Sequence, residues 1–285
     1  MKRNLKNTLL LLSILLAGCS KNINLDLPTP TPEVVVEGHI EPNSVAYLYL
    51  SHSFAFFGST TISSIIANDV IHGAKITISD GSTTDSMREV IPTLGYYEST
   101  TMKGKIGKTY NLTVVTGGQT LTSSTTILPP VPLDSAWFEV HGNLDTLGYM
   151  WAILNDPPAP GNCYRWLAKR IGEDTTFIPP NESAFNDQFI NGQRFKFYYG
   201  RGEIPGSKAA DDTNAEAGYF KTGEKVVIKF CAIDYASYNF YSLYYFQENN
   251  NGNPFGSPTP IVGNINGGLG IWCGYGSYLD TVICK

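Results

Sequence analysis

The sequence predicts a mainly β protein, and two observations carry the prediction. Short runs of alternating apolar and polar residues recur along the chain, separated by turns rich in glycine and proline. Tyrosine, phenylalanine and glycine are abundant, with 17, 14 and 28 copies, whereas the long Ala/Glu/Lys/Leu stretches typical of helices are missing. We therefore expect an N-terminal immunoglobulin-like β-sandwich followed by a second β-rich domain with one helix.

The first residues are typical of a lipoprotein signal. Three basic residues precede an apolar run over residues 9–17, which is too short to cross a bilayer as a helix and fits a secretory signal. The sequence LAGC at residues 16–19 resembles a bacterial lipobox, in which the chain is cut before the cysteine and the cysteine is acylated, for example with palmitate. We expect residues 1–18 to be removed and Cys19 to be the lipid attachment site.

A tether should follow the lipidated cysteine. Prolines alternate with threonines towards the end of residues 19–32, a composition that favours an extended chain without a packed core. Several acyl chains anchor a protein stably, because each buried methylene contributes about 0.8 kcal/mol. The sequence therefore predicts a domain held near a membrane by a spacer.

Residues 33–128 have the pattern of a first β domain. Alternation over residues 33–41 and 73–81 predicts strands with one apolar face. Gly117 and Gly118 follow another alternating run and predict a two-residue hairpin turn. The proline-rich sequence LPPVPL at residues 128–133 then interrupts the pattern and marks the expected domain boundary.

Residues 133–285 should form the second, β-rich domain. Asp234 is placed to cap a helix over residues 235–248. The expected strands cover residues 136–140, 149–154, 164–171, 194–199, 225–233 and 279–284.

Four cysteines follow Cys19, and an even number in an exported chain suggests two structural disulfides. They are Cys163, Cys231, Cys273 and Cys284, which allow three pairings. We prefer a Cys273–Cys284 bridge across a turn-prone segment, which leaves Cys163 to pair with Cys231, although the sequence does not fix the connectivity. The chain contains no CxxC motif, so thioredoxin-like chemistry and the usual zinc spacings are not expected.

Charge and motifs exclude several functions. The formal net charge is −5 and the chain has no run of Lys or Arg, so nucleic acid is not an expected partner. GxSxG, HExxH and GxxxxGK[ST] are absent from the sequence. No catalytic residue, metal ligand or cofactor is therefore predicted.

Three weaker patterns have a functional and a structural interpretation. Glu37, His39 and Glu41 share one face of a strand and could hold a metal, but a solvated polar face is favoured. Residues 211–216 offer oxygen ligands that could suit calcium, yet they lack the spacing of an EF-hand loop. The tyrosines within residues 235–245 could form a platform for sugar rings or a protein partner, and the favoured alternative is the packed face of a helix.

Several segments together resemble a known family. They are VVVEGHI at 34–40, GAKITI at 73–78, GYY at 95–97, GKTYNL at 107–112, FNDQFINGQ at 185–193, GEKVV at 223–227, NPF at 253–255 and NINGGLG at 264–270. In this order they resemble the Bacteroidota outer-membrane lipoproteins grouped as domain-of-unknown-function family 4249. The resemblance covers nearly the whole mature chain, and NINGGLG is its most specific part.

The resemblance implies a location at the outer membrane and a partner protein, but it supplies no reaction and no catalytic residue. Such proteins are often encoded beside TonB-dependent outer-membrane transporters, which implies an accessory or capture role beside the transporter barrel. Surface-exposed lipoproteins of this phylum usually carry an acidic cluster after the cysteine, whereas here only Asp26 is acidic. A surface-exposed and a periplasm-facing position both stay open.

We therefore expect a non-enzymatic accessory or capture lipoprotein of the outer membrane, associated with a TonB-dependent transporter. Two alternatives are a surface hydrolase acting on glycan or peptide, which would use carboxylates, and a structural or adhesive surface protein. The identity of the cargo does not follow from the sequence.

The lipid anchor can be tested by removing the acylated side chain. Cys19→Ala should leave an uncut or soluble precursor, because processing and acylation both require the cysteine. Fractionation of cells into soluble and membrane parts, followed by immunoblotting, measures the outcome. Membrane retention equal to that of the wild type would contradict the lipoprotein interpretation.

Overall fold

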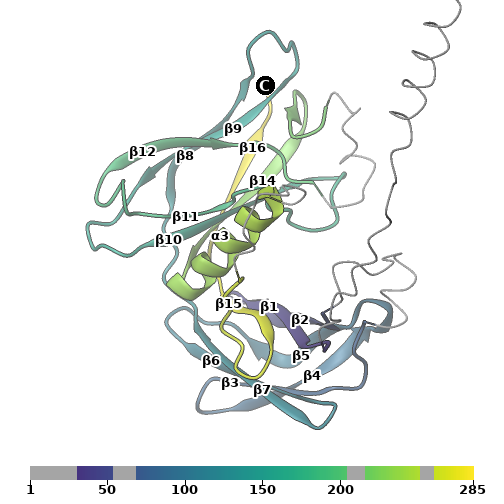
Figure 1. Ribbon diagram of the computed structural model, residues 1–285. Helices are drawn as coiled ribbons and strands as arrows, with labels where there is room; N and C mark the ends of the chain where they lie inside the picture. The colour runs from purple at the N-terminus through teal and green to yellow at the C-terminus, as the bar shows by residue number, and fades with distance from the viewer. Residues whose placement is uncertain (1–30, 54–68, 204–215, 251–259) are drawn as a thin grey trace, which may run out of the picture. The chain divides into compact units, whose positions relative to one another are not determined.

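The computed structural model describes residues 31–53, 69–203, 216–250 and 260–285. Residues 1–18, Cys19 and nearly all of the tether lie outside the described residues. Pro32–Lys285 forms one compact unit, and its described part is mainly β, as predicted (Figure 1). No described helix is long and apolar enough to cross a membrane. Residues 127–132 contain no strand or helix, and the division into two domains at this segment stays a prediction.

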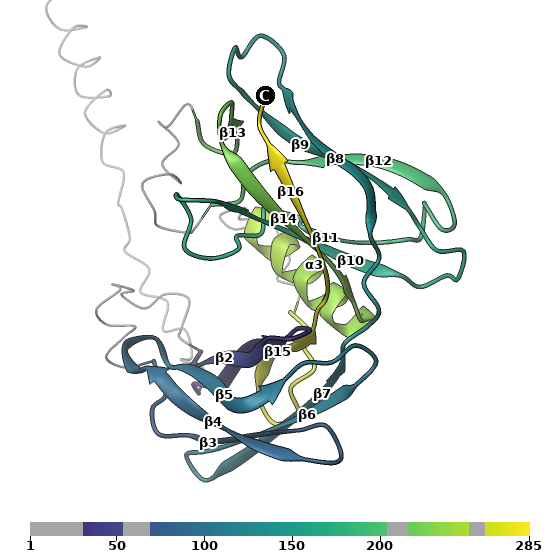
Figure 2. The same ribbon diagram turned by 180° about the vertical axis from the view of Figure 1, so that it is seen from behind.

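Eight strands form the first sheet, in the order β15-β1-β2-β5-β4-β3-β6-β7 (Figures 1 and 2). Neighbours pair antiparallel except β1 and β15, which are parallel. The strands are β1 Val34–Ile40, β2 Val45–His52, β3 Lys75–Ser79, β4 Thr84–Ile91, β5 Tyr96–Lys103, β6 Thr109–Thr116, β7 Gln119–Thr126 and β15 Leu269–Gly274, and a short 3-10 helix η1 spans Pro92–Leu94. Gly117 and Gly118 form the predicted turn between β6 and β7, with φ of 55° and 77°, as a two-residue hairpin of this kind requires.

The first sheet curls until its two edges meet around a core. The Gly274 N–H donates to Thr125 Oγ1 at 2.8 Å, and Thr122 forms a bridge with Asn266, which joins the β15 edge to the β7 edge. Trp272 from β15 is fully buried in this core, and its Nε1 donates to the Tyr110 carbonyl at 3.1 Å. The first sheet is thus not built from residues 33–128 alone, because a strand from the end of the chain completes it.

The second half is a sandwich of two sheets. One has the order β11-β10-β14-β16, and in the other β9 pairs with β8, β12 and β13. The strands are β8 Leu133–Val140, β9 Leu147–Asn155, β10 Cys163–Arg170, β11 Ala184–Asn186, β12 Arg194–Tyr199, β13 Phe220–Lys221, β14 Lys225–Ile233 and β16 Gly276–Ile283. Alternating apolar residues of both sheets face one core, which contains Met150, Trp166 and Phe230. The strands predicted for this half are confirmed.

The predicted helix is confirmed as α3, Tyr235–Asn250. Asp234 caps it, because its Oδ1 accepts a hydrogen bond from the Ser237 N–H at 2.8 Å. The helix packs against β10, β11 and β15, and a third core lies among them. As a consequence, β10 is covered on both faces, by the sandwich core and by the helix, and all of its residues from Cys163 to Ala168 are buried.

The prediction of two disulfides is wrong, since the structure has Cys163, Cys231, Cys273 and Cys284 as free, buried thiols. The expected hairpin between Cys273 and Cys284 does not form, because β15 pairs with β1 while β16 pairs with β14.

The register between β10 and β14 is incompatible with the other expected bridge, Cys163–Cys231. Cys163 lies opposite Ile233 and Cys231 opposite Arg165, so the two cysteines are diagonal neighbours. Diagonal positions are roughly 7–8 Å apart, whereas the Cα atoms of a disulfide are usually about 4.4–6.8 Å apart.

The thiols should be present but protected in the folded protein. Burial raises the pKa of Cys163, Cys231 and Cys284 to about 12, and the thiolate is the reactive form. A chain of residues 20–285 purified without reductant should therefore titrate as four thiols with Ellman's reagent in denaturant. When folded, near pH 8, it should react at least about tenfold more slowly. An intact mass lower by two hydrogens per bridge would contradict this expectation.

Candidate functional site: an aromatic cleft around Arg165

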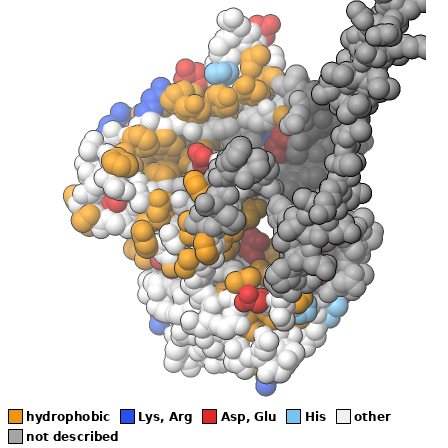
Figure 3. All heavy atoms as spheres, in the orientation of Figure 1, with side chains coloured by type: hydrophobic (Ala, Val, Ile, Leu, Met, Phe, Trp, Pro, Cys, Tyr) orange, Lys and Arg blue, Asp and Glu red, His pale blue; other side chains and the backbone are white. Residues whose placement is uncertain are grey.

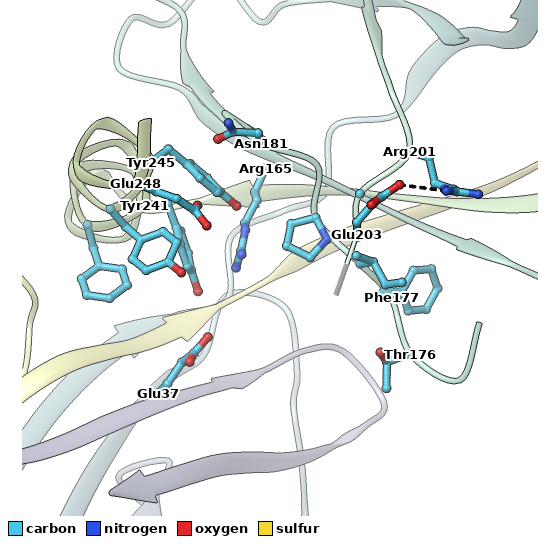
Figure 4. Close-up of a pocket in the computed structure, with 15 residues that line it drawn as sticks. Glu37, Arg165, Thr176, Phe177, Asn181, Arg201, Glu203, Tyr241, Tyr245 and Glu248 are labelled. Carbon is cyan, nitrogen blue, oxygen red and sulfur yellow. Dashed lines mark hydrogen bonds and ion pairs between the residues drawn. The ribbon is translucent and has the colours of Figure 1, made fainter. Parts of the chain in front are cut away.

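A cleft of about 650 Å³ lies between α3, β1, β10 and the segments 176–181 and 201–203 (Figure 4). Its size is within the range of pockets that hold small ligands. Aromatic side chains from α3 and from the loop after β10 form much of the lining, together with charged groups of both signs. The aromatic residues are Phe177, Phe240, Tyr241, Tyr244 and Tyr245, and the charged ones are Glu37, Arg165, Arg201, Glu203 and Glu248.

Arg165 is the buried cation of this cleft. It lies on the face of β10 that points towards α3, and the residue is only 6% exposed. Its guanidinium carbon lies 3.4 Å from the centre of the Tyr241 ring, a cation–π contact, and Nη1 donates to Tyr275 Oη. Tyr241 Oη and Tyr275 Oη are themselves 3.0 Å apart. Two neutral phenols therefore hold the guanidinium in place.

Arg165 and Tyr275 also line a smaller hollow of about 130 Å³, together with His39 and Tyr47. The His39 ring stacks on Tyr275 with 4.2 Å between the ring centres, and meets Tyr47 edge-on at 4.1 Å. Burial lowers the pKa of His39 well below its usual value, and the charges of Lys229 and Arg165 lower it further. His39 is therefore neutral near pH 7.

A buried ion pair lies beyond this hollow. Lys229, which is 7% exposed, places Nζ 2.7 Å from both carboxylate oxygens of Glu41. Ser277 Oγ donates to the same carboxylate at 2.7 Å. The pair joins the residue after β1 to β14 and satisfies the charge of Lys229.

The structure separates the residues that could have shared a metal on the first strand. Glu37 lines the large cleft, His39 stacks on Tyr275, and Glu41 pairs with Lys229. Within the described ranges no group of three or more His, Cys, Asp or Glu side chains could hold a metal ion. The polar segment 211–216 lies outside the described residues except for Glu216, whose carboxylate pairs with Lys221.

The tyrosines of α3 divide between packing and the cleft. Tyr241 and Tyr245 are buried, at 4% and 6% exposure, whereas Tyr244 is 42% exposed and lines the cleft. Tyr235 is 65% exposed and does not line it. The packed helix face was the favoured interpretation and is confirmed for Tyr241 and Tyr245.

The acidic groups of the cleft differ in their bonding. Glu203 accepts a hydrogen bond from Arg201 at 2.8 Å and another from the Gly218 N–H at 2.8 Å. Glu37 and Glu248, in contrast, form no ion pair among the described residues. These two carboxylates remain able to accept hydrogen bonds.

A second cluster of aromatic rings lies on the strands β8, β9 and β12, over which hydrophobic side chains gather in Figure 3. Trp137 and Trp151 are stacked at 6.4 Å, Tyr198 lies 4.7 Å from Trp151, and Lys196 Nζ is 4.0 Å from the Trp151 ring. This cluster is separate from the cleft, since none of these residues lines it.

Arg165 is not among the residues that the sequence predicts to be functional. A signal was present, however, because the strand CYRWLAKR places an arginine among residues that are apolar on both faces. A charged residue within such a run is rarely buried without a partner. Tyr275 could not have been linked to Arg165, since 110 residues separate them in the chain.

The described chain is thus a mainly β protein with an aromatic-lined cleft around Arg165. The family model described as "Domain of unknown function (DUF4249)" matches residues 20–278, and the chain belongs to this family. A search of curated proteins found no match. Among solved structures, a two-domain fibronectin type III segment of chicken tenascin covers 73% of this chain and 92% of its own, with 10% identity and a TM-score of 0.21. That TM-score is too low to support an argument about this chain.

The lowered pKa of His39 predicts acid sensitivity. Below about pH 6.5, His39 is protonated in the unfolded state but stays neutral in the folded state. The free energy of unfolding therefore falls as the pH falls. Relative to about pH 8, the loss at about pH 5.5 should be on the order of 1 kcal/mol. Urea unfolding at about pH 8 and at about pH 5.5 measures it.

His39→Phe should remove this part of the pH dependence, whereas the exposed His141→Phe should retain it. An unchanged slope in His39→Phe would show that other groups cause the acid sensitivity.

Proposed function

We propose that this protein is a lipid-anchored outer-membrane lipoprotein that captures a small ligand in the Arg165 cleft and associates with a TonB-dependent transporter. The proposal combines the lipobox at residues 16–19 and the tether after Cys19 with the cleft. The immunoglobulin-like nature of the first half is part of the same proposal. In this role the chain binds and releases its ligand without changing it.

The observation that carries the capture role is the composition of the cleft. Aromatic faces such as Tyr244 offer stacking surfaces, and Glu37 and Glu248 offer acceptors that no described cation occupies. Apolar surface with a few polar groups that converge is the usual composition of a small-molecule site. Arg165 adds a second argument, because it is 6% exposed and forms no ion pair among the described residues, and a buried charge without a partner is costly in a purely structural cavity.

A second candidate is a hydrolase that acts on glycan or peptide. The observation that favours it is the presence of three carboxylates, Glu37, Glu203 and Glu248, in one cleft, since glycoside hydrolysis uses a pair of such groups. Glu203 is the least available of the three, because it already accepts hydrogen bonds from Arg201 and from the Gly218 N–H.

Isolation from native membranes distinguishes these functions. The full-length chain, tagged at its C-terminus, is purified from detergent-solubilised membranes, and partners are quantified by mass spectrometry. We expect a transporter barrel in stoichiometric amount, absent from a control isolation of an unrelated tagged lipoprotein. If the chain is always isolated alone and cleaves members of a glycan and peptide panel, with the activity lost in Glu37→Gln, the hydrolase is correct.

A further inference from the structure

Arg165 differs from the other buried cation of the described chain in having no carboxylate partner. Lys229 is buried to the same degree, and Glu41 neutralises it at 2.7 Å. Arg165 forms no ion pair with any described Asp or Glu. Its Nε is also buried without a hydrogen-bond partner among the described residues. A guanidinium stays charged at all physiological pH values, so within the described part of the chain no carboxylate compensates this full positive charge.

This charge faces the cleft. Figure 4 shows the Arg165 side chain extending from β10 into the cavity, beside Tyr241 and above Glu37. Tyr241 and Tyr275 restrict its orientation, one through a ring contact and the other through a hydrogen bond. An arginine that neutral groups orient, and that pairs with no carboxylate of the described residues, is suited to bind an anion, because its side chain loses little further freedom on binding.

The rest of the lining restricts which anion fits. The charged residues of the cleft are two arginines and three glutamates, so a doubly charged phosphate meets more repulsion than a single carboxylate does. Glu37 and Glu248 accept hydrogen bonds and therefore suit a ligand with hydroxyl donors. The rings of Tyr244 and Phe240 suit the flat face of a ring.

We propose that Arg165 binds the carboxylate of a small hydroxylated ring acid, of the sugar-acid type, in this cleft. The inference rests on the capture function proposed above and specifies the chemistry of its ligand. The carboxylate compensates the charge of Arg165, the ring packs on the aromatic side chains, and the hydroxyl groups donate to Glu37 and Glu248.

Matched pairs of probes test the proposal by isothermal titration calorimetry on the mature chain with its lipid removed. D-Glucuronate and D-galacturonate are compared with D-glucose and D-galactose, which lack the carboxylate, and with glucose 1-phosphate, which carries a different anion. We expect at least one uronate to bind at least about tenfold more tightly than its neutral partner and than the phosphate ester. In Arg165→Gln this preference should fall below about twofold.

Two control variants accompany the measurement. Lys196→Gln removes a cation from the separate aromatic cluster and should keep the preference for the acid. Tyr235→Ala removes an exposed tyrosine of α3 outside the cleft and should also keep it, whereas Tyr244→Ala should weaken the binding of both members of a pair.

A direct spectroscopic readout covers the case in which Arg165→Gln does not fold. The ¹⁵N-labelled wild-type protein should show one arginine Nε–H signal that shifts with uronate and not with the neutral sugar, and Arg165→Lys, which lacks that signal, assigns it.

Four outcomes would contradict the proposed role of Arg165. Equal binding of acid and neutral sugar, tighter binding of the phosphate ester, no binding of any acid, or a preference that persists in Arg165→Gln would each overturn the role of Arg165. None of these results would remove a copurifying transporter barrel, so the failure of this inference and the failure of the proposed function are separable.

Discussion

The parallel pairing of β1 with β15 is the constraint on which the rest of the described structure depends. Because β15 leads into β16 with only Tyr275 between them, the end of the chain is first a strand of the curled sheet and then a strand of the sandwich. Gly270 permits the close approach of β15 to β1. It has a φ of 104°, and a Cβ there would lie 1.9 Å from the Val36 carbonyl oxygen, so any side chain would force the two strands apart.

The change from one sheet to the other also positions Arg165, the buried cation of the cleft. Tyr275 occupies the position at which the chain leaves the first sheet, and there it meets groups from three distant parts of the sequence. His39 comes from β1, Arg165 from β10 and Tyr241 from α3. The helix is held by its cap at Asp234, whose second oxygen accepts a hydrogen bond from Thr125 of β7 at 3.1 Å. The contacts that hold β15 and α3 in the fold therefore also position the residues around Arg165.

The two buried cations illustrate two ways of placing a charge inside a protein. Lys229 is compensated by Glu41 and Ser277, which gives a closed polar network. Arg165 is held by the Tyr241 ring and the Tyr275 hydroxyl, which orient a guanidinium without neutralising it. A cavity adjoins the second group, whereas the first is fully bonded. This contrast is the basis on which we propose that Arg165 binds an anion.

Much of the local structure could be predicted from the sequence alone. Alternation along β1, the Gly117-Gly118 turn and the Asp234 cap follow from interactions between near neighbours, which a single sequence displays. The pairing of the strands and the positions of the cysteines, in contrast, depend on long-range contacts. The sequence around Cys273 is equally compatible with a hairpin and with an edge strand beside β1, and only the long-range pairing favours the second. The cleft also depends on long-range contacts, since Arg165 is oriented by Tyr275, 110 residues away. Contacts at that separation produce no periodic pattern in the sequence.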